Sequence, residues 1–181
     1  MPVYITNDEL KTIARNIPIG EQLAAASQQR GPSGATFLSH SSKDVEYIPA
    51  VIRILENHGA SVYIDKKDES LPPYTSRETA AILRQRVASC KKFVLFATKN
   101  SKDSRWVPWE LGLSDGFKRS NNTAVFPSVD NIYDPTWTQQ EYLGVYDRIA
   151  WGELQGYKDP LWMVWDQVAN SAIPLSSWLS R

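Results

Sequence analysis

Short apolar runs alternate with amphipathic segments between residues 35 and 129. Four runs rich in β-branched and aromatic residues predict strands at 35–39, 61–64, 92–98 and 123–129. Apolar residues at helical spacing predict three intervening helices, at 45–58, 76–90 and 106–119. Because strands and helices alternate and the strands are almost continuously apolar, the pattern predicts an α/β fold. Its central parallel sheet would be covered by helices on both faces.

The N-terminal residues follow a different pattern. Thr6 and Glu9 are typical of a helix start, and apolar residues continue at helical spacing up to Ile17. A second helical piece is predicted at 21–29, and the Gly- and Pro-containing residues 30–34 indicate a linker. We therefore predict an N-terminal helical arm and linker over 1–34 and a main domain over 35–181.

The C-terminal part, from residue 131, is irregular and rich in aromatic residues. It holds five of the seven tryptophans. We predict a short strand at 148–151 and a helix at 161–170. Two interpretations of the aromatic residues remain open, an interaction surface and ordinary core packing, and we favour packing because buried aromatic rings contribute much of a core.

Composition excludes several classes of protein. The 181 residues carry 20 Lys and Arg against 20 Asp and Glu, so no charge surplus favours nucleic acid as a partner. No apolar run is long enough to cross a membrane, and the first 30 residues are too charged for a signal peptide, so we expect a cytoplasmic protein. One cysteine and two histidines exclude an internal disulfide and a zinc cluster, and we expect no metal or bound cofactor.

Candidate chemistry follows from the predicted sheet, because ligands of such sheets bind at the carboxyl ends of the strands. The turn after the first predicted strand of the sheet is polar and precedes a helix, which suits phosphate or ribose hydroxyls. Its residues are Ser39, His40, Ser41, Ser42, Lys43 and Asp44. The alternative is a purely structural turn, in which Ser42 or Asp44 caps the next helix and His40 supports the strand end.

The helix predicted at 106–119 carries one acidic residue in an apolar setting. Helical spacing places four residues on one face: Trp106, Glu110, Leu113 and Phe117. A carboxylate beside a tryptophan is costly unless it is partnered, so Glu110 is a candidate functional residue. The alternative is a glutamate that the positive end of the helix stabilises.

The sequence lacks the common nucleotide and hydrolase motifs. Neither a P-loop nor a dinucleotide-binding glycine pattern occurs, and no GxSxG elbow supports a serine hydrolase. After the second predicted strand, Asp65 opens a charged loop that ends in Leu71-Pro72-Pro73-Tyr74. Such a tip could dock onto another copy or close over a ligand, or it could be an ordinary solvated loop.

Four segments in the same order resemble the Toll/interleukin-1 receptor (TIR) domain of bacterial proteins. They are Phe37-Leu38-Ser39-His40-Ser41-Ser42-Lys43-Asp44, Val62-Tyr63-Ile64-Asp65, Phe93-Val94-Leu95-Phe96-Ala97-Thr98 and Ser104-Arg105-Trp106-Val107-Pro108-Trp109-Glu110-Leu111. The resemblance covers 35–129 and implies a flavodoxin-like fold. It also implies cleavage of NAD+ as substrate, as in TIR proteins of Thoeris-type antiphage systems.

In NAD+-consuming members of this family the glutamate of the helix after the third strand is catalytic, which implies this role for Glu110. The resemblance also implies that 39–43 line the NAD+ site and that the loop from Asp65 to Tyr74 gates it and makes self-association contacts. Trp106 or another aromatic residue would stack on the nicotinamide or adenine. The implied product is ADP-ribose or a cyclic ADP-ribose signal, which an effector protein would read.

Two other functions fit the same sequence. One is a non-catalytic module that only associates with other TIR domains, which would leave NAD+ intact and depend on Leu71 and Tyr74. The other is a relative of nucleoside deoxyribosyltransferases, which share the sheet topology and use a glutamate on ribosyl bonds but act on free nucleosides.

Overall fold

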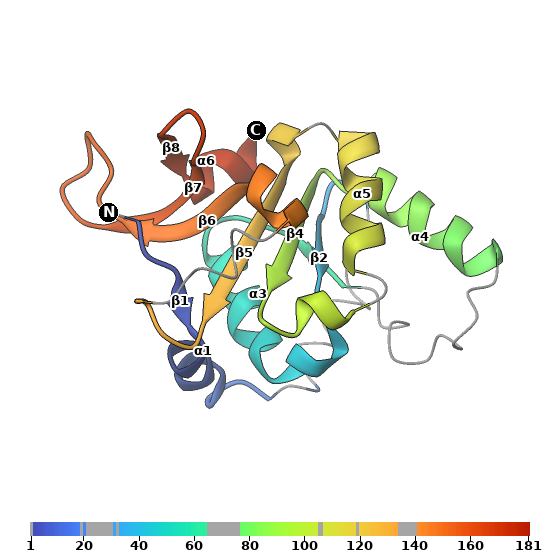
Figure 1. Cartoon of the computed structure of the whole chain (residues 1–181), viewed down its shortest axis with the longest axis horizontal. Coiled ribbons are helices and arrows are strands. Elements are labelled where there is room, and N and C mark those ends of the chain that lie inside the picture. The colour runs from blue at the N-terminus through green and yellow to red at the C-terminus, as the bar shows by residue number, and fades with distance from the viewer. Residues whose placement is uncertain are drawn as a thin grey trace.

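An eight-stranded sheet forms the centre of the folded domain (Figure 1). The computed structural model describes residues 2–18, 20, 31, 33–64, 77–104, 107–118, 120–133 and 141–181. Its strands are β1 Ile5–Thr6, β2 Thr36–Ser39, β3 Val62–Tyr63, β4 Lys92–Ala97, β5 Thr123–Val129, β6 Asp147–Gly152, β7 Leu161–Asp166 and β8 Ser171–Pro174. The strand order is β3-β2-β4-β5-β6-β7-β8, and β1 pairs with β5.

Helices connect the parallel strands. The α-helices are α1 Asn7–Ala14, α3 Ile48–Asn57, α4 Arg77–Ser89, α5 Val107–Lys118 and α6 Leu175–Ser180. Short 3-10 helices are η1 Ser42–Tyr47, η3 Ser101–Asp103, η4 Ser120–Asn122 and η6 Glu141–Val145. The parallel pairing of β3, β2, β4, β5 and β6 confirms the predicted α/β fold, and each strand and helix predicted between 35 and 129 is present near its predicted bounds.

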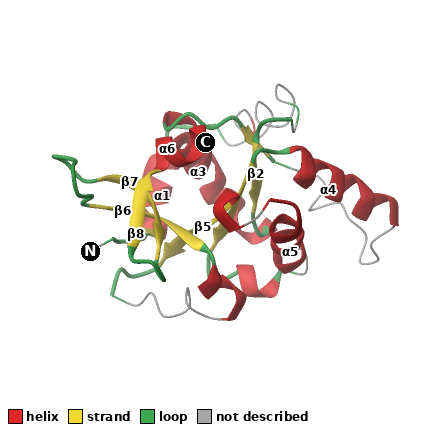
Figure 2. Ribbon diagram, turned by 90° about the horizontal axis from the view of Figure 1, so that it is seen from above, coloured by secondary structure: helices red, strands yellow, loops and turns green. Residues whose placement is uncertain are grey.

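Side-chain alternation along the strands divides the core into two layers. In β4, Val94 and Phe96 face one way and pack with residues of α3, whereas Phe93 and Leu95 face the other way and pack with α5. Figure 2 shows α1, α3 and α6 on one side of the strands and α5 on the other. Both faces of β4 are buried, which explains why its sequence is apolar at every position between Phe93 and Ala97.

The N-terminal helix is present where the sequence predicts it. Thr6 and Glu9 form a reciprocal capping box at the start of α1, with Glu9 N donating to Thr6 Oγ1 at 3.2 Å and Thr6 N donating to Glu9 Oε2 at 2.8 Å.

The N-terminal segment with β1 and α1 packs into the domain, unlike an appended arm. β1 joins the sheet beside β5, and Leu10 is completely buried in the core cluster that also contains Tyr47 and Ile48. Polar contacts add to this attachment, because the Asn7 amide donates to Asp130 Oδ1 at 2.6 Å. The described residues before 19 are thus part of the domain, and the helical piece predicted at 21–29 lies outside the described residues.

The predicted helix at 161–170 is wrong. This segment forms β7 and the turn that leads into β8, and both strands extend the sheet in antiparallel order after β6, a strand that the sequence did predict. Trp162 packs edge-on against Phe126 and Trp151, with ring centroids 5.3 and 5.7 Å apart. A short apolar and aromatic run fits either a helix or a strand, and here pairing with β6 decides for the strand.

Among the described helices, none combines the length and the apolar character that spanning a membrane requires.

Candidate active site

Glu110 and Ser39 meet at the carboxyl edge of the parallel strands. Ser39 ends β2, and Glu110 lies in the first turn of α5. The Ser39 hydroxyl donates a hydrogen bond of 2.5 Å to Glu110 Oε2. Both residues are buried, with exposed fractions of 2% and 6%. Glu110 therefore points into the fold beside the polar turn, where a charge-assisted hydrogen bond compensates part of its burial.

The rest of α5 is fixed to the sheet. Ser114 and Thr123 share a buried hydroxyl–hydroxyl hydrogen bond of 2.6 Å between α5 and β5. At the end of the helix, the Lys118 ammonium donates to the carbonyl oxygen of Cys90. These two contacts hold the helix on which Glu110 is carried, so the carboxylate belongs to a rigid element.

The buried face of α5 is not the one that the sequence predicted. Phe117, assigned to the same face as Glu110, is 53% exposed. The buried residues of α5 are Val107, Glu110, Leu111, Ser114 and Lys118, so Glu110 belongs to the buried stripe and Phe117 does not. The alternation of large apolar side chains on both faces of α5 made the choice ambiguous from sequence.

The turn after β2 divides into a buried and an exposed half. Ser39, His40 and Ser41 are buried, whereas Ser42 and Lys43 are exposed. The Ser41 hydroxyl accepts a hydrogen bond of 3.4 Å from the Lys43 amide and caps η1. The buried half of the turn holds the Glu110 contact, and in the exposed half the Lys43 ammonium pairs with Asp103 at 3.3 Å.

Burial lowers the pKa of His40 to about 4, despite its hydrogen bond with the Leu38 backbone. His40 is therefore neutral at physiological pH. A neutral, buried imidazole fits the structural alternative for this residue and does not act there as a proton donor.

We expect His40 to make the free energy of unfolding depend on pH. Its folded-state pKa lies below the unfolded value near 6.5, so its contribution is complete above pH 6.5 and is lost as the pH falls towards 4. The loss amounts to about 3 kcal/mol. Urea unfolding of the wild type and His40→Gln between pH 4 and 7.5 measures it: the difference between the two free energies of unfolding should shrink as the pH falls. If the difference between the two free energies of unfolding stayed constant over this pH range, the lowered pKa of His40 would be contradicted.

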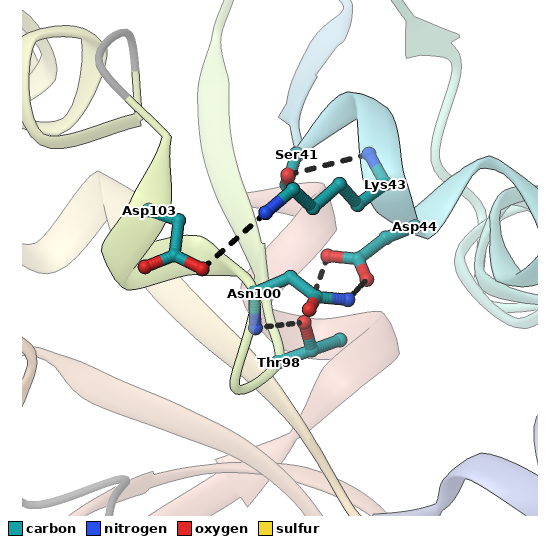
Figure 3. A network of polar contacts seen from close by, with 6 residues as sticks. All are labelled: Ser41, Lys43, Asp44, Thr98, Asn100 and Asp103. Carbon is teal, nitrogen blue, oxygen red and sulfur yellow. Dashed lines mark hydrogen bonds and ion pairs between the residues drawn. The ribbon is translucent and has the colours of Figure 1, made fainter.

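Asp44 has a different role from the helix cap that the sequence suggested. Ser41 caps η1, whereas the Asp44 carboxylate is completely buried and binds Thr98 and Asn100 beyond β4 (Figure 3). Sequence reasoning missed Thr98 and Asn100. Their position could have indicated them, because both follow a predicted strand directly and lie at the same edge of the sheet as Asp44.

Three further predicted site residues, Asp65, Leu71 and Trp106, lie outside the described residues. Their roles stay predictions. Of the predicted binding residues, the structure brings together Glu110 and the turn 39–43.

Comparison with known proteins identifies the family. The sequence model of the TIR domain family matches residues 36–160. This chain belongs to the TIR family. The TIR chain is 36% identical over 148 residues to "Probable 3' cyclic ADP-D-ribose synthase ThsB'" of Bacillus cereus (strain MSX-D12), covering 80% of this chain and 75% of that protein. It is also 34% identical over 83 residues to "Putative cyclic ADP-D-ribose synthase TIR2" of Cytobacillus dafuensis, covering 43% of this chain and 21% of the relative.

Two hollows elsewhere on the TIR domain are separate from this site. A cavity of about 360 Å³ is lined by Lys92, Asp147 and Arg181 among others, at the amino ends of β4, β5 and β6. A mainly apolar groove of about 660 Å³ lies between α1 and Trp151. Glu110 lines neither of them.

Proposed function

We propose that this TIR protein cleaves NAD+ between nicotinamide and ribose and converts the ADP-ribosyl part mainly into a cyclic ADP-ribose. The observation that carries the proposal is the buried Glu110 carboxylate, held by Ser39 at the carboxyl edge of the sheet. Family membership supports it, and so do the names of both relatives, which are described as cyclic ADP-D-ribose synthases.

One carboxylate suffices for this reaction. Glycosidases normally need a second acid, because the leaving oxygen must be protonated as the bond breaks. The nicotinamide of NAD+ leaves from a cationic pyridinium, takes both bonding electrons and becomes neutral without a proton. What the protein must supply is stabilisation of the positive charge that develops on the ribose.

Glu110 is suited to that task. The carboxylate provides a fixed negative charge, and its hydrogen bond from Ser39 orients one oxygen before the substrate arrives. A preorganised charge in a buried setting stabilises a developing cation more strongly than a solvated one. The first turn of α5 also places the carboxylate at the positive end of the helix, which favours its ionised form.

The product depends on what attacks the ribosyl cation. Water gives ADP-ribose and releases a proton. A nucleophilic atom of the same ADP-ribosyl molecule gives a cyclic product instead, which is lighter than ADP-ribose by one water because no water has been added. The relatives' names favour the cyclic product.

The turn 39–43 and Trp106 complete the proposed substrate site. The turn would supply hydroxyl groups and the Lys43 ammonium, which also pairs with Asp103, for the ribose and phosphates, and Trp106 would stack on a base of NAD+. The loop containing Asp65 and Leu71 would gate the site and contribute to self-association. The nucleotide product would act in the cytoplasm as a signal for a separate effector protein in antiphage defence.

Nicotinamide release tests the proposal. Purified protein is incubated with NAD+ at low and high protein concentration, and products are separated by liquid chromatography and identified by mass. We expect nicotinamide and a product lighter than ADP-ribose by one water, with faster release at high concentration if self-association assists the reaction. No NAD+ loss at any concentration would favour the non-catalytic module. Cleavage of free deoxynucleosides with NAD+ untouched would favour the deoxyribosyltransferase alternative.

A further inference from the structure

Asp44 links the loop after β2 to the loop after β4. Its carboxylate accepts hydrogen bonds from Thr98 Oγ1 at 2.8 Å and from Asn100 Nδ2 at 2.7 Å. Figure 3 shows Asp44 projecting from the start of η1 into the segment that carries Thr98, Asn100 and Asp103. Each carboxylate oxygen thus has its own donor, and both donors come from a segment more than fifty residues away in sequence.

The segment that Asp44 binds leads directly into the helix of Glu110. The Thr98 hydroxyl also accepts a hydrogen bond of 3.0 Å from the backbone N–H of Asn100, and the backbone N–H of Thr98 donates to Ser101 Oγ at 3.0 Å. η3 follows, and Ser104 Oγ then accepts from the Val107 amide at 3.3 Å, at the start of α5. A continuous series of hydrogen bonds therefore connects Asp44 to the turn of α5 that carries Glu110.

Burial of the Asp44 carboxylate is unfavourable for the stability of the fold. Asp44 is completely buried, and burial raises the pKa of its carboxyl group, although the bonds from Asn100 and Thr98 act in the opposite direction. An ionised carboxylate in such a place requires both of its hydrogen-bond donors. The desolvation cost offsets much of what these bonds contribute, so stability of the fold does not explain why a carboxylate is placed there. An exposed ion pair between Lys43 and Asp103, at 3.3 Å, joins the same two loops but adds little by itself.

We infer that Asp44 is a positioning residue, which holds the first turn of α5 against the turn 39–44 and so maintains the Ser39–Glu110 contact in its reactive geometry. This inference rests on the proposed function for its effect on catalysis. Asp44 itself acts through the two loops that it joins. The effect is specific because Ser39 ends the strand before Asp44, while Glu110 follows the segment that Asp44 binds.

Three variants separate positioning from folding. Asp44→Ala removes both acceptors. Asp44→Asn keeps the shape and still accepts from Thr98, and its amide can donate to Asn100 once the Asn100 amide turns over. Thr98→Val removes one donor with little change in volume, and it provides a second route if Asp44→Ala folds poorly. Asp159→Ala, at an exposed turn between β6 and β7, is the matched control.

We expect Asp44→Ala to lower kcat for NAD+ by about 100-fold, because a displacement of about 1 Å of a catalytic group has effects of this size. KM should change much less. Thr98→Val should give a smaller loss in kcat, and Asp44→Asn should recover most of the activity. In a Ser39→Ala background, Asp44→Ala should lower kcat less than it does in the wild type, because both changes act on the same contact.

Hydrogen exchange gives a readout that does not depend on activity. In Asp44→Ala and Thr98→Val, peptides covering 98–104 and the first turn of α5 should exchange faster, while β4, β5 and the Asp159→Ala control stay unchanged. Unchanged exchange at 98–111, or a full additional loss of kcat in the Ser39→Ala background, would overturn the inference. If the wild type releases no nicotinamide, the proposed function fails, and the exchange measurement still decides whether Asp44 holds α5.

Discussion

Glu110→Gln should lower nicotinamide release by about 1,000-fold, a size typical of losing one preorganised electrostatic group. Glutamine has nearly the same shape and still accepts the hydrogen bond that Ser39 donates to Glu110. It lacks the negative charge that stabilises the developing ribosyl cation. The loss should therefore appear in kcat, with KM little changed, because the interaction is made mainly in the transition state.

The control for Glu110→Gln is Asp115→Asn on the same helix. Asp115 is exposed, so the same change from carboxylate to amide is made without touching the Ser39 contact. Steady-state nicotinamide release and thermal unfolding are measured for both variants. We expect Asp115→Asn to match the wild type in both, and Glu110→Gln to unfold at or above the wild-type temperature. Substantial turnover by well-folded Glu110→Gln would remove Glu110 from the proposed mechanism.

Leu10→Ala should lower the free energy of unfolding by about 2–5 kcal/mol, the cost typical of removing a completely buried leucine side chain. Leu10 is fully buried in the core cluster and α1 packs against α3, so loss of its side chain leaves a cavity between these helices. Denaturant unfolding measures the effect. This result is not expected of an appended arm, which could lose an apolar residue without affecting the domain.

Lys11→Ala, one residue further along α1, provides the comparison. The Lys11 side chain is 43% exposed and pairs with Glu46 at 3.5 Å, a surface ion pair worth about 1 kcal/mol or less. If Leu10→Ala cost no more than Lys11→Ala, the first helix would be only loosely attached to the sheet.

The hydrophobic pattern was sufficient for the parallel half of the fold. The runs at β2, β4 and β5 are apolar on both faces, and segments with helical spacing separate these runs along the chain, so few other architectures could bury them. The same reasoning failed at 161–170, where the run around Trp162 and Trp165 is too short to show a period. Pairing with β6, a contact between segments that only the folded chain brings together, determines its conformation.

For the candidate site, the sequence was enough to select Glu110 and the turn 39–43 as candidates, because a carboxylate at a helix start and a polar turn after a strand are local features. The network of Asp44, Thr98 and Asn100 was out of reach. An aspartate near a helix start is usually a cap, and no local pattern distinguishes a cap from a carboxylate that binds a distant loop.

The sequence by itself determined the order of the strands and helices between 35 and 129, the family resemblance and the candidate residues Glu110 and 39–43, since each depends on neighbouring positions along the chain. Only the tertiary structure decided which of these residues meet. It placed Ser39 against Glu110 and Asp44 against Thr98, and it packed Leu10 into the core. The physical reason is that hydrogen-bond partners and core neighbours are set by the packing of distant segments, which periodicity does not record.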